Sequence, residues 1–239
     1  RTHEVVNTPP HIRDQDLWDG DPVLRHWSSV TGADIHAGHL ATAGKRLGRE
    51  EVFEKARQAN RYPPELCAFD RYGMRLNAVE FHPAYHDLMR LAVENGLHDF
   101  AWQHEGDAGH VGHAALTYMF AQSEGGVLCP MSMTYSSIPA LRHSPDLAAE
   151  WMPRILSGQY DARDIPASEK TGALIGRFMT EKQGGSDLRS NSTEARPIRD
   201  DRQGPGAGYL LKGHKFFCSA PMCDAFLVLA RTPQAEGGG

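Results

Sequence analysis

The stretch RFMTEKQGGS, residues 177–186, marks the point at which the chain changes from helical patterning to strand patterning. A short apolar segment, residues 173–176, precedes it, and a polar segment follows it. The stretch itself combines a hydroxyl, a carboxylate and adjacent glycines, and glycine allows the backbone to come close to a polar ligand. We therefore expect a ligand to lie against residues 177–186.

A second cluster of aromatic and hydroxyl side chains follows further along the chain, in the stretch GHKFFCS at residues 213–219. An aromatic ring offers a flat apolar face, and a hydroxyl both donates and accepts hydrogen bonds. We interpret the two stretches as two walls of one cofactor site.

The composition is that of an ordinary globular protein. The chain has 239 residues, of which 40% are hydrophobic, and a formal net charge of -5. Such a chain can form one large or two modest domains, and its charge does not point to a nucleic acid or an anionic membrane as partner. No apolar run approaches the roughly 20 residues of a membrane helix, and the N-terminal residues lack a signal-peptide pattern, so we expect a cytoplasmic protein. The cysteines form no C-x-x-C pair and are expected to be reduced thiols.

Residues before position 173 show helical periodicity. An extended arm is expected over residues 1–30, and a turn-rich connector over 69–81. Apolar spacing and capping residues predict helices at 34–47, 50–60, from His82-Pro83 onward, 98–123, 138–143 and 146–156. The long helix over 98–123 is rich in small residues and is expected to pack closely on its neighbours.

From residue 173 the pattern becomes that of strands. Short apolar or alternating runs near 174–179, 209–211 and 225–229 are separated by Asp200-Asp201 and by the hairpin sequence GPGAG at 204–208. Three or four strands are too few to close a barrel or sandwich. The sequence thus predicts an α+β multidomain protein, with a helical domain over 1–172 and the first part of a β domain over 173–239.

Two pairs of histidines and one glutamate have the residue types of functional sites. His82 with His86, and His110 with His113, have helical spacing suited to a metal, but they lack acidic or cysteine partners, so we interpret them as surface or packing residues. No metal site is expected. Glu181 lies beside the glycines, and we interpret it as a structural carboxylate that pairs or caps within its loop.

Longer motifs carry a family resemblance. MTEKQGGSD (179–187), followed by GHKFFCS (213–219) and DAFLVLART (224–232), resembles the two flavin signatures of the acyl-CoA dehydrogenases. The branch that the chain most resembles is the adaptive-response, or AidB-type, branch. This is indicated by Lys182-Gln183, where most of the family has Pro-Gly, and by the motifs NRYPPEL (60–66), FHPAYH (81–86) and LCPMSMT (128–134). The resemblance covers nearly the whole chain.

The resemblance implies a helical N-terminal domain, a middle β domain and a C-terminal helical bundle, with FAD as cofactor and usually a homotetramer. This chain is expected to hold the first domain and part of the second. The implied cofactor-binding residues are Arg177, Met179, Thr180, Gly185, Ser186, Phe217, Cys218 and Ser219.

Each of these residues has an implied role. Met179 and Thr180 would lie along the flavin ring, with the Thr180 hydroxyl near N5, and Gly185 and Ser186 beside the pyrophosphate. Residues 217–219 match the family's Trp-Ile-Thr, with Phe in place of Trp and Ser in place of Thr. Arg177 stands where the wider family often has an aromatic residue.

In the family, a carboxylate takes the α-proton of an acyl thioester while a β-hydride moves to flavin N5. That carboxylate is usually a glutamate of the C-terminal bundle, so no catalytic residue is assigned in this chain. Dehydrogenation of an acyl thioester is the leading hypothesis. The alternatives are a flavoprotein that mainly binds DNA and protects it from alkylation, and an oxidase or monooxygenase on the same scaffold. The expected partners are the thioester, other subunits and a C-terminal segment or chain that completes the fold; DNA is possible but not supported by this segment, and no membrane is expected.

Overall fold

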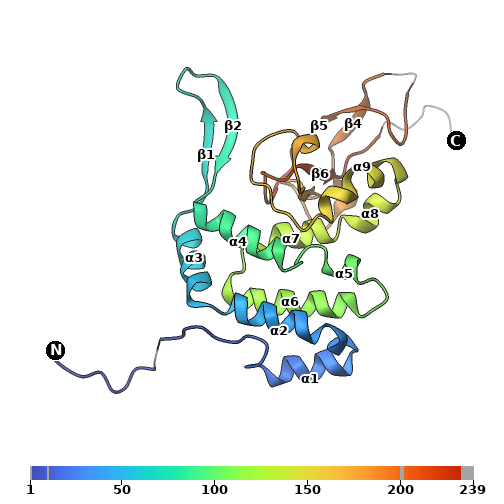
Figure 1. Cartoon of the computed structure of the whole chain (residues 1–239). Coiled ribbons are helices and arrows are strands. Elements are labelled where there is room, and N and C mark those ends of the chain that lie inside the picture. Colours follow the sequence, from blue (N-terminus) through green and yellow to red (C-terminus); the bar gives the residue numbers. More distant parts are fainter. Residues whose placement is uncertain (1, 10, 200–201, 233–239) are drawn as a thin grey trace.

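The computed structural model describes residues 2–9, 11–199 and 202–232, and its helices precede most of its strands (Figure 1). The helical elements are α1 (Pro22–Val30), η1 (Ala33–His36), α2 (Ala37–Leu47), α3 (Glu50–Arg61), α4 (Pro83–Glu94), α5 (Phe100–Gln103), α6 (Gly109–Ser123), α7 (Leu128–Tyr135), α8 (Ile138–Arg142), α9 (Pro145–Ile155), η2 (Ala167–Glu169) and η3 (Leu188–Ser190). The strands are β1 (Glu65–Phe69), β2 (Arg75–Glu80), β3 (Ile175–Phe178), β4 (Glu194–Pro197), β5 (Tyr209–Lys212) and β6 (Ala225–Val228).

Capping residues start two of the helices. Asp21 accepts hydrogen bonds from the backbone N–H groups of Val23 and Leu24 at 3.0 and 2.8 Å, directly before α1. His82 Nδ1 accepts from the N–H of Ala84 at 3.2 Å, and Pro83 occupies the first position of α4, where its missing N–H costs nothing. The helix start predicted at His82-Pro83 is confirmed.

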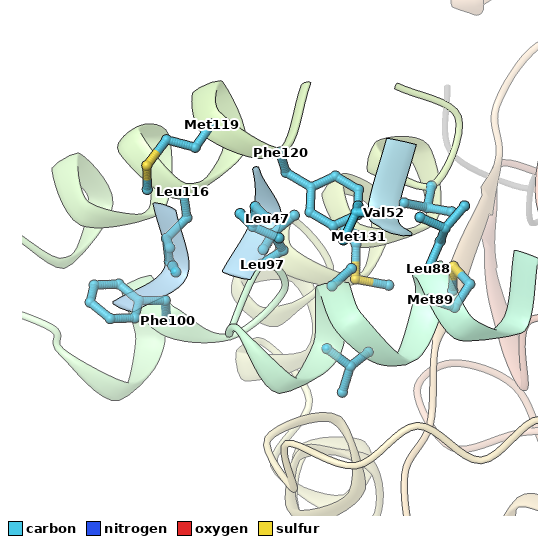
Figure 2. Packing of buried hydrophobic residues seen from close by; sticks show 14 of the residues in the cluster. Leu47, Val52, Leu88, Met89, Leu97, Phe100, Leu116, Met119, Phe120 and Met131 are labelled. Atoms are coloured by element: carbon cyan, nitrogen blue, oxygen red, sulfur yellow. The ribbon is translucent and has the colours of Figure 1, made fainter. Parts of the chain in front are cut away.

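The main core lies among α2, α3, α4, α6 and α7, whose buried apolar side chains form one cluster. Figure 2 shows Phe120 of α6 beside Met131 and Val52, with Leu88 and Met89 of α4 close by, all of them members of one buried cluster. Burial of each such side chain contributes about 1.5–3 kcal/mol. This layer of helices forms the rigid support on which the strands rest.

Two expectations about the helices are corrected. The segment 98–123 is not one helix, because the chain leaves the helical conformation between α5 and α6, where Gly106 and Ala108 have φ of 88° and 53°. These left-handed values cannot be accommodated in a right-handed helix. Among the described residues, the expected arm over 1–30 is not extended throughout, because residues 17–20 form turns and α1 begins at Pro22.

The connector expected at 69–81 is instead part of an antiparallel β-hairpin formed by β1 and β2. Its register pairs Glu65 with Glu80 and Phe69 with Arg75, with one irregularity between Cys67 and Phe69. Asn77 has a φ of 53°, which fits a bulge in β2. The hairpin stands away from the helical layer (Figure 1).

The second part of the chain, which begins at residue 173, forms two small sheets. β3 pairs parallel with β6, and β4 pairs antiparallel with β5. The strands expected near 174–179, 209–211 and 225–229 are thus confirmed, whereas β4 was not expected. The Gly-rich turn at 204–208 lies between β4 and β5, and the N–H of Ile198 donates to the carbonyl of Gly208 at 2.9 Å. Asp200 and Asp201 lie outside the described residues.

Within the described ranges, no helix is long and apolar enough to cross a membrane. The same part of the chain contains no group of three or more His, Cys, Asp or Glu side chains able to hold a metal ion. His110 and His113 both contact Tyr135: His110 Nδ1 lies 2.7 Å from the Tyr135 hydroxyl, and the His113 ring stacks on the Tyr135 ring at 4.1 Å.

Candidate cofactor site

β3 leads from the helical layer into the second part of the chain. The stretch 177–186 begins within β3 and continues beyond its end. The N–H of Ile175 donates to the hydroxyl of Thr134 on α7 at 3.1 Å, and Thr134 is fully buried. Gly176 faces Phe226 of β6, and a Cβ at this position would lie 2.5 Å from a ring carbon of Phe226. Only glycine therefore allows β3 and the Phe226 ring to approach this closely.

A buried ion pair fixes the point where β3 and β6 begin. Lys170 Nζ lies 2.7 Å from Oδ1 of Asp224, and the two side chains are 6% and 7% exposed. The other oxygen of Asp224 accepts from the N–H of Leu174 at 2.8 Å, while the Asp224 N–H donates to the Leu174 carbonyl at 2.9 Å. The starts of both strands are thereby held side by side.

The two stretches highlighted by the sequence are neighbours in space. The N–H of Phe216 donates to the carbonyl of Thr180 at 3.0 Å, and Lys215 Nζ donates to the carbonyl of Met179 at 3.3 Å. An isolated antiparallel bridge also joins Glu181 to Lys215. The expectation that the stretches lie side by side is confirmed, while what they bind stays a prediction.

Glu181 is the anchor of this arrangement, with a side chain that is 1% exposed. One of its oxygens accepts from the N–H and hydroxyl of Ser192, both at 2.8 Å. The other accepts from the N–H and hydroxyl of Thr193, at 2.8 and 2.5 Å, and lies 3.1 Å from Lys215 Nζ.

Hydrogen bonds from the backbone N–H of Ser192 and from the hydroxyl of Thr193 are the main reasons that the pKa of Glu181 lies far below its ordinary value. The carboxylate is therefore ionised and fully paired at neutral pH. The structural interpretation of Glu181 is confirmed.

Several residues that hold this loop were not assigned from the sequence. Asn191 donates from Nδ2 to the carbonyl of Met179 at 2.7 Å, and Arg231 donates from Nε to the carbonyl of Asn191 at 2.6 Å. Lys215 belongs to the second stretch, but no role for it follows from the sequence. The polar run Asn-Ser-Thr at 191–193 could have indicated that these residues hold the loop, because three consecutive hydrogen-bonding side chains favour a turn over a regular strand.

Within the first wall, Thr180 lies beside Gly185. A Cβ placed on Gly185 would lie 3.0 Å from Cγ2 and 3.2 Å from Oγ1 of Thr180. A glycine thus keeps the space beside the Thr180 hydroxyl open. Ser186 is exposed at the end of this turn, and Arg177 is half-buried in β3 opposite Leu227.

Within the second wall, Phe217 is 79% exposed and has a φ of 57°. Phe216 packs edge-on against it, with ring centroids 4.7 Å apart. Cys218 is half-buried, and this burial raises the pKa of its thiol. Ser219 is exposed, and its N–H donates to the carbonyl of Phe217 at 3.2 Å. The Phe217 backbone is in the left-handed region, and its exposed ring has a large apolar surface available for a ligand.

The two walls together offer the groups that a flavin dinucleotide needs. A planar ring system packs on an aromatic face, and its polar edge takes hydrogen bonds from hydroxyls and backbone amides. Phosphate oxygens are bound by amides in glycine-containing turns. The residues of both walls fit such a cofactor in type and in accessibility.

A separate cavity of about 620 Å³ lies between the hairpin and the second part of the chain. Its lining includes Glu80, Tyr160, Lys170 and Met222, but none of the predicted cofactor residues. Lys170 is already neutralised by Asp224, so the cavity lacks a free buried charge at this point. We place the candidate site at the two walls, where hydroxyls, glycine and an exposed ring converge.

Comparison with known protein families gives two matches that together span most of the chain. Residues 7–162 match the family described as adaptive response protein AidB N-terminal domain. Residues 176–239 match the acyl-CoA dehydrogenase middle domain.

Individual relatives agree with these matches. The putative acyl-CoA dehydrogenase AidB of Escherichia coli (strain K12) is 41% identical over 97% of this chain. The chain spans only 42% of the length of that relative. Two solved structures are similar: the apo form of Bd2924, and Caenorhabditis elegans ACDH-11 in complex with C11-CoA.

The likeness to Bd2924 has a TM-score of 0.80 and 28% identity, and it covers 95% of this chain and 44% of that one. The likeness to ACDH-11 has a TM-score of 0.78 and 26% identity, and it covers 100% of this chain and 40% of that one.

Proposed function

This chain belongs to the acyl-CoA dehydrogenase family, in its AidB branch, and on that basis we propose that it is part of an FAD-dependent oxidoreductase. The proposed reaction is the α,β-dehydrogenation of an acyl thioester or a related activated substrate. When bound, the FAD supplies the hydride acceptor of this reaction. The chain itself supplies walls that hold and orient the cofactor.

The observation that carries the proposal is the contact between the two signature stretches. The Phe216 N–H to Thr180 carbonyl bond, at 3.0 Å, brings one wall against the other. Around this contact lie the hydroxyls of Thr180 and Ser219, the open space at Gly185 and the exposed ring of Phe217. This combination of groups is suited to a planar cofactor with a polar edge and a phosphate tail.

We assign roles to the wall residues accordingly. Met179 and Thr180 contact the flavin ring, and the Thr180 hydroxyl donates near N5. Phe217 and Cys218 pack against the ring, and the Ser219 hydroxyl bonds to its edge.

For the phosphates, Gly185 permits close backbone approach to the pyrophosphate, and Ser186 donates to a phosphate oxygen. Arg177 influences how an acyl group lies near the ring. Neither Glu181 nor any other carboxylate of this chain is proposed as the catalytic base.

The wider assembly is also a proposal. We propose a division at residues 172 and 173, a cytoplasmic location, a homotetramer, and a C-terminal segment or chain that completes the fold. The complex of ACDH-11 with C11-CoA supports an acyl thioester as the substrate class. The net charge of -5 gives no support to DNA as partner.

The test is the cofactor content of the full assembly, purified with the segment or chain that completes the fold. We expect visible flavin absorbance and the release of FAD on heating. Thr180→Ala and Ser219→Ala are expected to lower the FAD content or shift its reduction potential. Thr171→Ala, at an exposed position just before β3, serves as control and is expected to change neither. Absence of FAD in the purified assembly would contradict the proposal.

A further inference from the structure

The β-hairpin of residues 65–80 is built to stand clear of the helical layer (Figure 1). Asp70 closes its turn by accepting from the N–H groups of Tyr72 and Met74, both at 2.8 Å. A two-stranded hairpin of this length is marginally stable by itself in water. Its hydrogen-bonded turn and its paired strands therefore suggest that it is supported by something further.

The two edges of the hairpin have different surroundings. β2 lines the cavity that separates the hairpin from the loop containing Tyr160. On the opposite side, no backbone hydrogen bond joins β1 to any residue outside the hairpin in the part of the chain that the structure describes. An unpaired strand edge presents a row of N–H and C=O groups that pairs readily with another strand.

Apolar side chains are exposed on the hairpin. Leu66 is 70% exposed and Phe69 is 54% exposed on β1, the strand with the free edge, and Leu76 is 55% exposed on β2. A strand that carries exposed apolar side chains and a free edge is a typical docking element for a further strand.

Charges on one face of the hairpin are separated along its length. Glu65 and Glu80 lie directly opposite each other at the base, which is an unfavourable pairing of like charges. Near the turn, Arg75 lies opposite Phe69, and its guanidinium carbon is 5.0 Å from the centre of the Phe69 ring. The base is thus acidic, and the region near the turn is basic.

We propose that β1 pairs edge to edge with β1 of a second copy of this chain, antiparallel about a two-fold axis that passes beside Cys67. The two hairpins then form one four-stranded sheet. In this register, Glu65 lies opposite the partner subunit's Phe69, and Cys67 lies opposite the partner subunit's Cys67.

Charge complementarity favours a second copy of this chain as the partner that pairs with the free edge of β1. The antiparallel arrangement brings the acidic base of each hairpin to the basic region of the other. Adjacent strands lie about 4.8 Å apart. The Arg75 guanidinium lies over the ring of Phe69 on β1 and also donates to Oδ1 of Asn77 at 3.2 Å. In the proposed register it comes within reach of the partner subunit's Glu65. Each contact occurs twice, as a two-fold interface requires.

This inference rests on the homo-oligomer proposed above and specifies one of its interfaces, but it does not depend on the flavin. A hairpin of this size buries less surface than a stable dimer needs by itself, so we expect the sheet to be one part of a larger contact. Loss of the sheet is therefore expected to lower the mass of the assembly without removing its cofactor.

The test reverses the charge at one of two positions in each variant. Light scattering then measures the mass of the assembly. Glu65→Arg and Arg75→Glu are each expected to weaken self-association by about tenfold or more, because each places like charges across the interface. Glu65→Arg also removes the repulsion from Glu80 within the hairpin, so its effect cannot come from unfolding of the hairpin. Arg71→Glu, in the turn and outside the paired strands, makes the same change in charge and is expected to have no effect.

Mixing the two variants is the decisive step. An equimolar mixture restores opposite charges in both halves of the interface, so we expect the wild-type mass to return, as it also should in the Glu65→Arg/Arg75→Glu double variant. A mild thiol oxidant is expected to join two wild-type chains through Cys67, and Cys67→Ser is expected to abolish this cross-link.

Two results would overturn the inference. Unchanged mass in both single variants shows that the oligomer, if present, uses another surface. Reduced mass that mixing does not restore shows that the hairpin edge contacts something other than a second copy. A wild-type protein that is monomeric overturns the oligomer and this interface together, while the FAD content tests the cofactor separately.

Discussion

Lys215 Nζ lies 3.1 Å from Oε1 of Glu181, and the two side chains are only 9% and 1% exposed. Glu181 belongs to the first signature stretch and Lys215 to the second. One buried ion pair thus connects both walls of the candidate site. Since the carboxylate is also saturated by donors from Ser192 and Thr193, it acts as a fixed structural centre.

Replacement of Glu181 by Gln is expected to destabilise the fold. The amide cannot accept at both ends, so donors of Thr193 or Ser192 are left buried without an acceptor, as is the charge of Lys215. Glu194→Gln is a matched control, because its exposed pair with Arg196 contributes about 0–1 kcal/mol. Urea unfolding at pH 7 should show a clearly larger loss for Glu181→Gln. Equal losses would contradict the structural role.

The same comparison has a predicted dependence on pH. The folded-state pKa of Glu181 is depressed, so its contribution to stability is present above the unfolded pKa of about 4.3 and is lost as the pH falls toward the folded value. The stability difference between wild-type and Glu181→Gln should therefore be constant from pH 7 to about 5 and narrow at more acidic pH. A difference that grows on acidification would be inconsistent with this assignment.

Removal of the Lys170 charge is expected to cost about 3–5 kcal/mol of unfolding free energy, because it leaves Asp224 buried without its cation. Lys170→Met is the test, measured by denaturant unfolding. Lys212→Met on exposed β5 is the control and should change stability by less than about 0.5 kcal/mol. A loss in Lys170→Met no greater than the control would show that the pair is not needed to hold β3 against β6.

The helical part of the fold was largely predictable because its signals are local. Gly48 after α2, Pro83 at the start of α4 and the acidic first turn of α3 fix where these helices begin or end. The break at Ala108 was missed, since alanine favours helix, whereas Ala108 has a left-handed φ of 53°. The hairpin was missed because its strands are short and partly exposed.

The site was predictable only in part, for a similar reason. Residues that contact each other along one stretch, such as Thr180 and Gly185, share a motif. The pairing of Glu181 with Lys215 and the bond from Arg231 to Asn191 join positions far apart in sequence, and they depend on the parallel pairing of β3 with β6. No local pattern specifies that pairing.

The proposed cofactor role predicts a specific rescue at Gly185. Gly185→Ala should lower FAD retention by about tenfold or more, because the new Cβ meets Cγ2 of Thr180 at 3.0 Å and displaces the side chain. Thr180→Ser removes that Cγ2 and keeps the hydroxyl, so the double variant should regain part of the retention. Dialysis followed by flavin fluorescence measures this. Equal retention in Gly185→Ala and wild-type would remove this turn from the proposed site.

His113 provides a prediction about pH that does not depend on the cofactor. Burial, with a smaller contribution from His110, lowers the pKa of His113 to about 4. Because the unfolded value is about 6.5, the unfolded chain binds more protons between these values, and the stability that His113 contributes is lost as the pH falls from 6.5 to 4.

The stability of the wild-type protein should fall between pH 6.5 and 4. In His113→Phe this fall should be smaller. A phenyl ring preserves the stacking on Tyr135 at 4.1 Å and removes Nδ1, which is buried without a hydrogen-bond partner in the described structure. Stability at pH 7 should therefore be unchanged or higher. His143→Phe, at an exposed position that does not contribute to the pKa shift of His113, is the control. An NMR titration that gave His113 an ordinary pKa near 6.5, or equal slopes for wild-type and His113→Phe, would show that the imidazole is not held neutral by its packing.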